Sequence, residues 1–416
     1  MIQKRTAIDY RLVMPSSIFQ RAFALLSLGR ANYVWGQVYR SYVQRRCDLI
    51  VRQLKVTETP PVGVEHSPLF DWILFVKADD ESNARAQIAR SKVKLGQKMV
   101  FFQPGNGTEF DQWVGAVVSH DSLQPINEVR LIGPEMPVHK RIHDQSFTVF
   151  DDPGNHHWSR MEGALGADVF RKFRSTEVLL VGAGRLGSLL ATTWIRNGLH
   201  RLTIIDPDEL EPHNRDSTFG NLPEDIGAPK ATILVKHLAS IRPDSMVTAI
   251  QGSVQDDHLL DRFRRAEIVI SCVDNDQCRK YVAMRCAELL CLHLDVGTIV
   301  RRVSESDSED SSPYGVEVAA DIRLIIPGSC LNCVGGLEIV SDGVTDITWR
   351  SGGRIGSLTS INHMAVGAAQ QNWFDFLAGR ITSSWWQRLR WSSEEGLTGT
   401  AGPVSGNDDC SVCQLE

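Results

Sequence analysis

The segment Val178-Leu179-Leu180-Val181-Gly182-Ala183-Gly184-Arg185-Leu186-Gly187 decides the fold. Its apolar start is typical of a buried strand, and the GxGxxG pattern then opens onto an expected helix at residues 185–197. Gly182 permits the tight turn, Gly184 lets the backbone approach a phosphate, and Gly187 allows close helix–strand packing. Free N–H groups at the start of the helix favour an anion. The segment therefore predicts a nucleotide-binding strand–turn–helix unit.

Strands and helices alternate downstream of this unit. We expect strands at residues 177–182, 201–205, 268–272 and 292–296, and helices at 185–197, 230–241 and 277–290. This alternation predicts an α/β fold with a Rossmann-like, mostly parallel sheet. In such a sheet the carboxyl ends of the strands meet at one edge, and ligands bind there.

Polar residues follow the expected strands at that edge. Asp206 ends the second strand, about 20 residues after the glycine turn, where a carboxylate can bind ribose hydroxyls. Asn214-Arg215, Gly227-Ala228-Pro229-Lys230 and Asp274-Asn275 come later. Cations together with a carboxylate suit a triphosphate with magnesium. A nicotinamide dehydrogenase is the alternative that the glycine pattern alone would equally allow.

With these residues in place, the stretch from residue 158 to about 303 resembles the ThiF/MoeB/HesA family, the adenylating core that ubiquitin-activating enzymes share. The resemblance implies ATP and Mg²⁺. It assigns Asp206, Asn214 and Asn275 to ATP binding with the glycines, and Asp274 to magnesium. Arg215 and Lys230 would stabilise the charge that builds up on the phosphates.

The sequence departs from the family pattern at two places. Arg185 stands where the family has a second glycine. Asn214 and Arg215 are adjacent, and the family's following glutamine is missing, so the loop is shortened and the two residues do not match the pattern equally well.

His157-Trp158-Ser159-Arg160 resembles the arginine-containing segment that precedes the first strand in the family. There the arginine reaches across a dimer to the triphosphate of the neighbouring subunit. The resemblance implies this catalytic role for Arg160, and a homodimer with it.

Two CxxC pairs lie towards the end of the sequence, Cys330/Cys333 and Cys410/Cys413. Four thiolates satisfy a closed, tetrahedral, structural zinc site, and in a reducing compartment such pairs indicate a metal before disulfides. The family has a zinc clamp of the same pattern, so we expect Zn²⁺ here.

Many family members carry the activated protein as a thioester on a cysteine between these pairs, but residues 334–409 contain no cysteine. Two alternatives remain open. The reaction stops at the acyl adenylate, or a hydroxyl of Ser357, Thr359 or Ser360, in the glycine-rich stretch 351–360, accepts the acyl group. A hydroxyl needs a base or an oxyanion site, and the sequence identifies neither.

We expect residues 1–140 to form a smaller α+β domain, residues 141–157 a linker, and residues 158–416 the adenylation domain. A helix is expected at 16–28 and strands at 47–56 and 113–119. The loop at 103–111 resembles that of JAB/JAMM metalloproteases, but Phe101-Phe102-Gln103-Pro104 stands where that family has its HSHP segment, so neither histidine is present. The resemblance implies a metal-free binding module, and an unrelated α+β adaptor is the alternative.

The net charge of −6 argues against nucleic acid as the main partner. No apolar run of about 18 residues and no signal peptide is present, so we expect a cytoplasmic protein that is not embedded in a membrane.

The predicted function is adenylation of the C-terminal carboxylate of a ubiquitin-like protein, in a bacterial conjugation system, for transfer to a conjugating enzyme or another acceptor. Adenylation of a sulfur-carrier protein and a non-catalytic scaffold that retains the fold are the alternatives.

Overall fold

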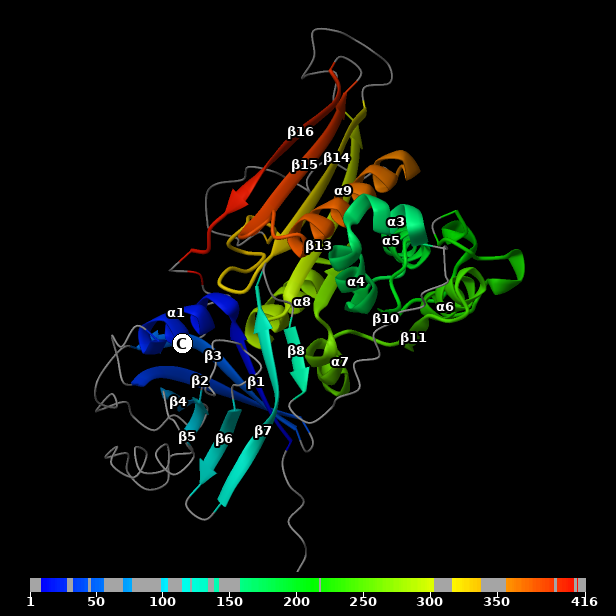
Figure 1. The fold of residues 1–416 in the computed structure, drawn as a ribbon. Helices are drawn as coiled ribbons and strands as arrows, with labels where there is room; N and C mark the ends of the chain where they lie inside the picture. The colour runs from blue at the N-terminus through cyan, green and yellow to red at the C-terminus, as the bar shows by residue number, and fades with distance from the viewer. Residues whose placement is uncertain are drawn as a thin grey trace, which may run out of the picture. The chain divides into compact units, whose positions relative to one another are not determined.

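The structure, a computed structural model, describes residues 9–27, 33–43, 46–55, 70–76, 99–103, 114–119, 122–133, 138–141, 158–216, 218–302, 316–337, 357–392, 395–407 and 410. The chain divides into two compact units, Met1–Asp151 and Asp152–Glu416 (Figure 1). The division falls within the stretch 141–157. Over the described ranges, none of the helices combines the length and apolarity needed to cross a membrane.

The N-terminal unit is an eight-stranded mixed sheet with one described helix. Its elements are β1 (Asp9–Pro15), α1 (Ser16–Ser27), β2 (Tyr33–Val43), β3 (Arg46–Lys55), β4 (Phe70–Val76), β5 (Met99–Gln103), β6 (Val114–Ser119), β7 (Ser122–Ile132) and β8 (Val138–Arg141). The strand order is β1-β3-β2-β4-β5-β6-β7-β8, and β1 also pairs with β7, so the order returns to its start. The expected helix is α1, and the expected strands are β3 and β6.

The core of this unit forms where one face of α1 packs on the strands. Phe19, Ala22 and Leu26 recur at helical spacing and are buried together with Leu12 and Leu49. Buried charge is compensated beside it, because Arg11 donates to the Asp48 carboxylate at 2.8 and 2.9 Å. The 103–111 loop of the metalloprotease resemblance lies outside the described residues after Gln103.

The C-terminal unit alternates strands and helices along most of its length. Its elements are α3 (Ser159–Leu165), α4 (Ala167–Ser175), β9 (Glu177–Val181), α5 (Arg185–Arg196), β10 (Arg201–Asp206), η3 (Pro212–Asn214), η4 (Pro223–Asp225), α6 (Lys230–Ile241), β11 (Met246–Gln251), η5 (Asp257–Leu259), α7 (Leu260–Arg265), β12 (Ile268–Ser271), α8 (Asp276–Leu289), β13 (Leu292–Arg302), β14 (Val316–Ile325), α9 (Thr359–Leu377), β15 (Ser384–Ser392) and β16 (Gly396–Val404).

The sheet of this unit has the order β11-β10-β9-β12-β13-β14-β15-β16. It is parallel from β11 to β13, and β14, β15 and β16 extend it antiparallel. The chain leaves β9 for β10 and β11 on one side and later returns to β12 on the other. The strand order therefore reverses beside β9, the point at which open α/β sheets bind ligands in a crevice outside the carboxyl ends of their strands. The predicted Rossmann-like, mostly parallel α/β fold is confirmed.

Helix α9 provides much of the aromatic core on one face of this sheet. Figure 1 shows it beside β13 and β14, and it also packs on α4 and α5. Its Trp373 stacks on Trp194 of α5 and on Phe376, with ring centroids 6.5 and 5.1 Å apart. Phe173 of α4 meets Trp194 edge-on at 5.8 Å. This interlocking fixes the start of α9 relative to the glycine turn, because α5 begins at that turn.

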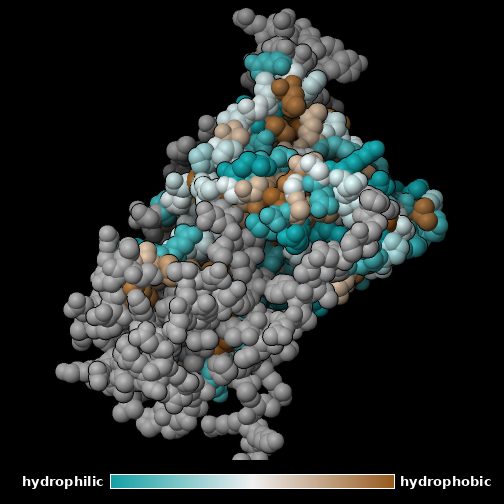
Figure 2. All heavy atoms as spheres, viewed as in Figure 1, coloured by the Kyte–Doolittle hydropathy of each residue, from teal (hydrophilic) through white to brown (hydrophobic). Residues whose placement is uncertain are grey.

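The outer hairpin, β15 and β16, leaves some apolar surface uncovered. Trp391 and Leu397 are paired across it and are 46% and 49% exposed. Figure 2 shows hydrophobic surface at the upper end of these strands.

Candidate functional site

The glycine turn has the geometry that the sequence predicted. Gly182 has a φ of +100°, and a Cβ there would lie 2.7 Å from the carbonyl oxygen of Cys272. A Cβ on Gly187 would lie 1.9 Å from the carbonyl oxygen of Gly182. At Gly184, by contrast, a Cβ would meet no described atom within 4 Å. The first and third glycines are needed for packing, and the second leaves open space beside the start of α5.

Asp206 is held against this turn. Its carboxylate accepts hydrogen bonds from the backbone N–H groups of Ala183 at 2.6 Å and Asp208 at 2.9 Å. Burial raises the pKa of Asp206, and the two backbone hydrogen bonds oppose that rise. Each oxygen has a second lone pair, so the carboxylate fixes the turn and has acceptor capacity left for a hydroxyl donor.

Lys230 reaches the same edge from the start of α6. The backbone of Leu210 bonds to that of Ala228, and the N–H of Lys230 donates to the carbonyl of Asp208 at 3.0 Å. The Lys230 ammonium, with its side chain 10% exposed, pairs with the Asp208 carboxylate at 2.8 Å, whereas the Asp208 side chain is 62% exposed. A sheltered cation thus lies close to Asp206.

Asp274 and Asn275 follow β12 and lead into α8. Asp274 is exposed. The Asn275 side chain accepts from the backbone N–H groups of Gln277 and Cys278 at 2.9 and 3.2 Å, so it caps α8. The structure thus gives Asn275 a capping role beside the ATP contact that the resemblance implied.

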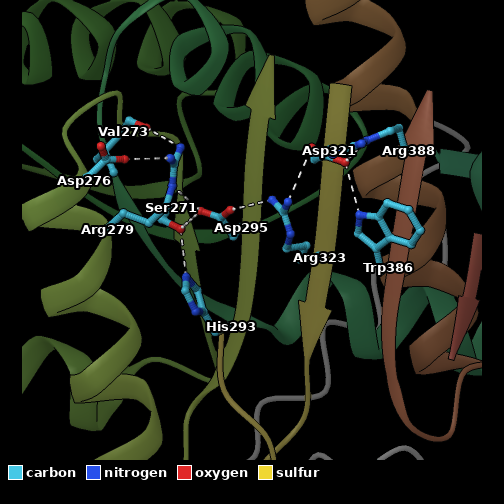
Figure 3. Close-up of polar contacts among 10 residues, drawn as sticks. All are labelled: Ser271, Val273, Asp276, Arg279, His293, Asp295, Asp321, Arg323, Trp386 and Arg388. Atoms are coloured by element: carbon cyan, nitrogen blue, oxygen red, sulfur yellow. Dashed lines mark hydrogen bonds and ion pairs between the residues drawn. The ribbon is translucent and has the colours of Figure 1, made fainter. Parts of the chain in front are cut away.

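A row of alternating charges, buried at its centre, supports this loop, and we call it the charged ladder (Figure 3). It consists of Asp276, Arg279, Asp295, Arg323, Asp321 and Arg388. At its first end, Arg279 donates to the carbonyl of Val273 at 2.6 Å and to the Asp295 carboxylate at 3.1 Å. The residue immediately before Asp274 is thereby fixed by a buried ion pair.

The charged ladder continues across the antiparallel strands. Arg323 lies opposite Asp295, 3.5 Å from its carboxylate and 3.4 Å from that of Asp321. Arg388 of β15 binds Asp321 through two hydrogen bonds of 2.8 Å, and the indole N–H of Trp386 donates to the same carboxylate at 3.1 Å. Asp295 and Asp321 are fully buried. Each carboxylate has cations on both sides, which compensates its loss of hydration.

Ser271, His293 and Asp295 also meet, but they do not form a nucleophilic triad. Ser271 Oγ lies 2.7 Å from the Asp295 carboxylate and 2.8 Å from Nε2 of His293. The hydroxyl has one proton, which the carboxylate accepts, so Nε2 must donate to the Ser271 oxygen. A histidine protonated at Nε2 cannot accept the proton of Ser271. All three side chains are buried, and their hydrogen bonds satisfy one another inside the sheet.

His293 makes stability depend on pH. Burial lowers the pKa of His293 from 6.5 to about 4. Between these values the unfolded chain binds a proton that the folded chain does not, so stability falls as the pH decreases through this window. Across this window, the change in His293 protonation lowers the free energy of unfolding by up to about 3 kcal/mol. We expect the free energies of unfolding of wild type and His293→Gln, measured in urea, to converge as the pH falls through this window. Equal pH dependence in both proteins would contradict the assignment.

Arg160 and Arg215 lie apart from the contacts that hold the glycine turn. Arg160 is exposed on α3, a helix in which no residue is buried. The Arg215 side chain is exposed, and its backbone carbonyl accepts a hydrogen bond from the Asn221 side chain at 2.7 Å. Asn214 ends η3 next to it and is partly buried.

The three hydroxyl candidates lie at the start of α9. Thr359 and Ser360 are the first residues of this helix, not part of a loop, and both are exposed. Ser357 accepts from the side chain of Asn362 at 3.0 Å. Among the described residues, these contacts provide no general base for a hydroxyl.

Three of the four CxxC cysteines meet. The sulfur atoms of Cys330, Cys333 and Cys410 lie within 4.8 Å of one another. N–H groups of the Asn332 side chain and the Asn407 backbone donate to two of these sulfurs at 3.4 Å. Three clustered thiols, two of which accept N–H donors, fit a thiolate zinc site, whose fourth ligand in the sequence, Cys413, lies outside the described residues.

The other cysteines near the crevice are not activated. Burial raises the pKa values of the Cys272 and Cys278 thiols, which disfavours the thiolate.

A ubiquitin-like modifier-activating enzyme 5 of Oryza sativa subsp. japonica is 27% identical over 263 residues, which are 59% of this chain and 58% of that protein. The sulfur carrier protein ThiS adenylyltransferase of Escherichia coli K12 is 29% identical over 125 residues, 30% of this chain and 50% of that protein. The chain thus spans about half the length of such relatives.

Among solved structures, E. coli MccB with ATP is similar, with a TM-score of 0.47 and 18% identity over 62% of this chain and 74% of that one. The ThiF family matches residues 159–380, which contain the glycine turn, Asp206, Lys230, Asp274 and the start of the cysteine cluster. The chain belongs to the ThiF family.

Proposed function

We propose that this protein adenylates the C-terminal carboxylate of a ubiquitin-like protein with ATP. The observation that carries the proposal is the arrangement of Asp206 and Lys230 beside the open face of Gly184, with Asp274 on the loop that follows the neighbouring strand β12. A carboxylate oxygen attacks the α-phosphorus of ATP, the bond from that phosphorus to the bridging oxygen breaks, and pyrophosphate leaves.

The chain's residues have distinct roles in this displacement. Asp206 accepts ribose hydroxyls, and the N–H groups at the turn face a phosphate. Lys230, Arg215 and the Arg160 of a second copy neutralise the charge that develops on the phosphates. Asp274 would hold Mg²⁺, which neutralises the leaving pyrophosphate when it is bound.

The relatives support a substrate class. One is named for the activation of a ubiquitin-like modifier, and the other for a sulfur carrier protein. Both names support a small protein as substrate, handed on to a conjugating enzyme or another acceptor. A sulfur-carrier substrate is the second candidate, and it predicts a thiocarboxylate product where conjugation predicts an amide or an ester.

Pyrophosphate exchange tests the proposed function. The full-length chain, given ATP, magnesium and a panel of ubiquitin-like and sulfur-carrier proteins that end in glycine, should exchange labelled pyrophosphate into ATP with at least one of them. Asp274→Ala should abolish the exchange, and Asp257→Ala, which removes an exposed acid on η5, should leave it unchanged. A chain that neither binds ATP nor exchanges with any member would be a scaffold.

A structural zinc is proposed at Cys330, Cys333, Cys410 and Cys413. It would tie the segment around Cys410 to the region that packs on α8. We expect about one zinc per chain by elemental analysis. Cys330→Ser should lose most of it, whereas Cys278→Ser, outside the cluster, should keep it. Retention of zinc in Cys330→Ser would rule out this site.

For the N-terminal unit we propose a binding module that docks the substrate or the acceptor. Its loss from the full chain should raise the KM for the protein substrate and leave the affinity for ATP unchanged. A loss of ATP binding would contradict a docking role.

A further inference from the structure

Arg185 is placed where it can act on the nucleotide. It is the first residue of α5, directly after Gly184, whose neighbourhood is open. Its guanidinium, in a side chain that is 17% exposed, donates to the Asp216 carboxylate at 2.7 Å. A second nitrogen of the guanidinium donates to the Thr359 hydroxyl at 3.3 Å. One side chain therefore joins the glycine turn, the residues after η3, and the start of α9.

Lys230 has the same kind of partner. Both cations are sheltered, and each holds a carboxylate that is largely exposed: the Asp208 side chain is 62% exposed and that of Asp216 is 71% exposed. An exposed carboxylate remains well hydrated and gains little from such a pair, so another anion can replace it easily. A phosphate offers more oxygens and more charge to a guanidinium than a carboxylate does.

We propose that Arg185 is a further phosphate-binding residue, which Asp216 and Thr359 hold in place until ATP takes the position of the Asp216 carboxylate. This inference rests on the proposed function and adds a residue to it. Asp216 thus competes with the nucleotide for one guanidinium. When ATP binds, Asp216 is released, and the segment after η3 that contains Arg215 and Asp216 loses its contact with Arg185.

Competition and a merely structural bridge predict opposite effects at Asp216. If Asp216 competes with phosphate, Asp216→Asn frees the guanidinium and tightens ATP binding. If Arg185 only ties the turn to its neighbours, Asp216→Asn breaks the bridge and weakens binding, as Arg185→Gln does.

The test is calorimetric titration of the full-length chain with ATP and magnesium. We expect Arg185→Gln to raise the dissociation constant about tenfold, since a charge-assisted hydrogen bond is lost. Arg185→Lys should recover part of the loss, and Asp216→Asn should lower the constant two- to threefold. In the double variant Arg185→Gln/Asp216→Asn the gain should vanish, because no guanidinium remains to be freed. Arg171→Gln, which breaks an exposed pair with Asp168 on α4, is the matched control and should bind as wild type does.

Two results would overturn the inference while the proposed function stands: unchanged ATP binding in Arg185→Gln, or weaker binding in Asp216→Asn. If ATP binding is unchanged in Arg185→Gln, the remaining role for Arg185 is contact with the carboxylate of the protein substrate. No binding of ATP by the wild-type chain would overturn the proposed function itself, and the role of Arg185 with it.

Discussion

Asp295→Asn is expected to lower the free energy of unfolding of the C-terminal unit by about 3 kcal/mol. The substitution keeps the shape of the side chain and removes its charge, so Arg279 and Arg323 lose the carboxylate between them. Burial alone would raise the pKa of Asp295, but the two guanidinium groups overcome it and hold the pKa below its ordinary value. Because the folded pKa is depressed, this stabilisation is present above the unfolded pKa and is lost as the pH falls through the folded value.

The measurement must report on the C-terminal unit alone. Hydrogen exchange of peptides from β13 and β14 does so, and their protection should fall in proportion to the lost free energy. Asp375→Asn is the matched control, because it removes a carboxylate that Arg380 contacts at 2.7 Å. The Arg380 side chain is 60% exposed, so we expect the free energy of unfolding to fall by less than about 1 kcal/mol.

A second substitution separates charge from shape. In the Asp295→Asn background, Arg323→Met removes a cation that has lost one of its two carboxylates and should recover part of the stability. Two results would show that the charged ladder does not stabilise the sheet through charge. One is wild-type hydrogen-exchange protection in Asp295→Asn. The other is a destabilisation by Arg323→Met in the Asp295→Asn background that equals its destabilisation of wild type. Loss of the loop position held by Arg279 should also raise the magnesium concentration needed for exchange.

The charged ladder is the part of the site that sequence reasoning missed. Asp295, Asp321 and Arg323 each lie between apolar neighbours in their strands, and a charged residue in a strand normally indicates a solvent-facing side. Only the pairing of β13 with β14 brings Asp295 opposite Arg323, and that register depends on residues far apart in the chain. The available signal was the alternation Asp321-Ile322-Arg323 within a strand that is otherwise apolar.

The glycine turn could be predicted because its requirements are local. A positive φ at Gly182 and the close approach at Gly187 leave little choice of residue, so the pattern carries the geometry with it. The partners of Arg185 could not be predicted in the same way, because Asp216 and Thr359 reach it from two other segments. Helix α9 was not expected either, since its mixed polar and apolar residues pack on several neighbours at once.

Lys230→Ala is expected to reduce pyrophosphate exchange about 100- to 1,000-fold, the loss typical when a preorganised charge is removed from a transition state. Lys230 is the first residue of α6, where the positive end of the helix dipole disfavours a cation. The structure keeps a sheltered ammonium there nonetheless, 2.8 Å from Asp208. A cation held against the dipole, beside a carboxylate that binds the glycine turn, is better explained by a phosphate ligand than by helix stability. The variant should therefore be as stable as wild type while its exchange collapses.

Lys236→Ala supplies the control on the same helix. Its side chain is 71% exposed and lies 3.7 Å from Asp225, so the substitution removes the same charge away from the crevice. Exchange in Lys236→Ala should stay within about twofold of wild type, because salt screens the charge of an exposed side chain. Steady-state rates at saturating ATP separate the role further: a cation that acts on the developing charge lowers kcat, whereas one that only binds ground-state ATP raises KM. Equal rates for the two lysine variants would remove Lys230 from the chemistry and leave it as the partner of Asp208.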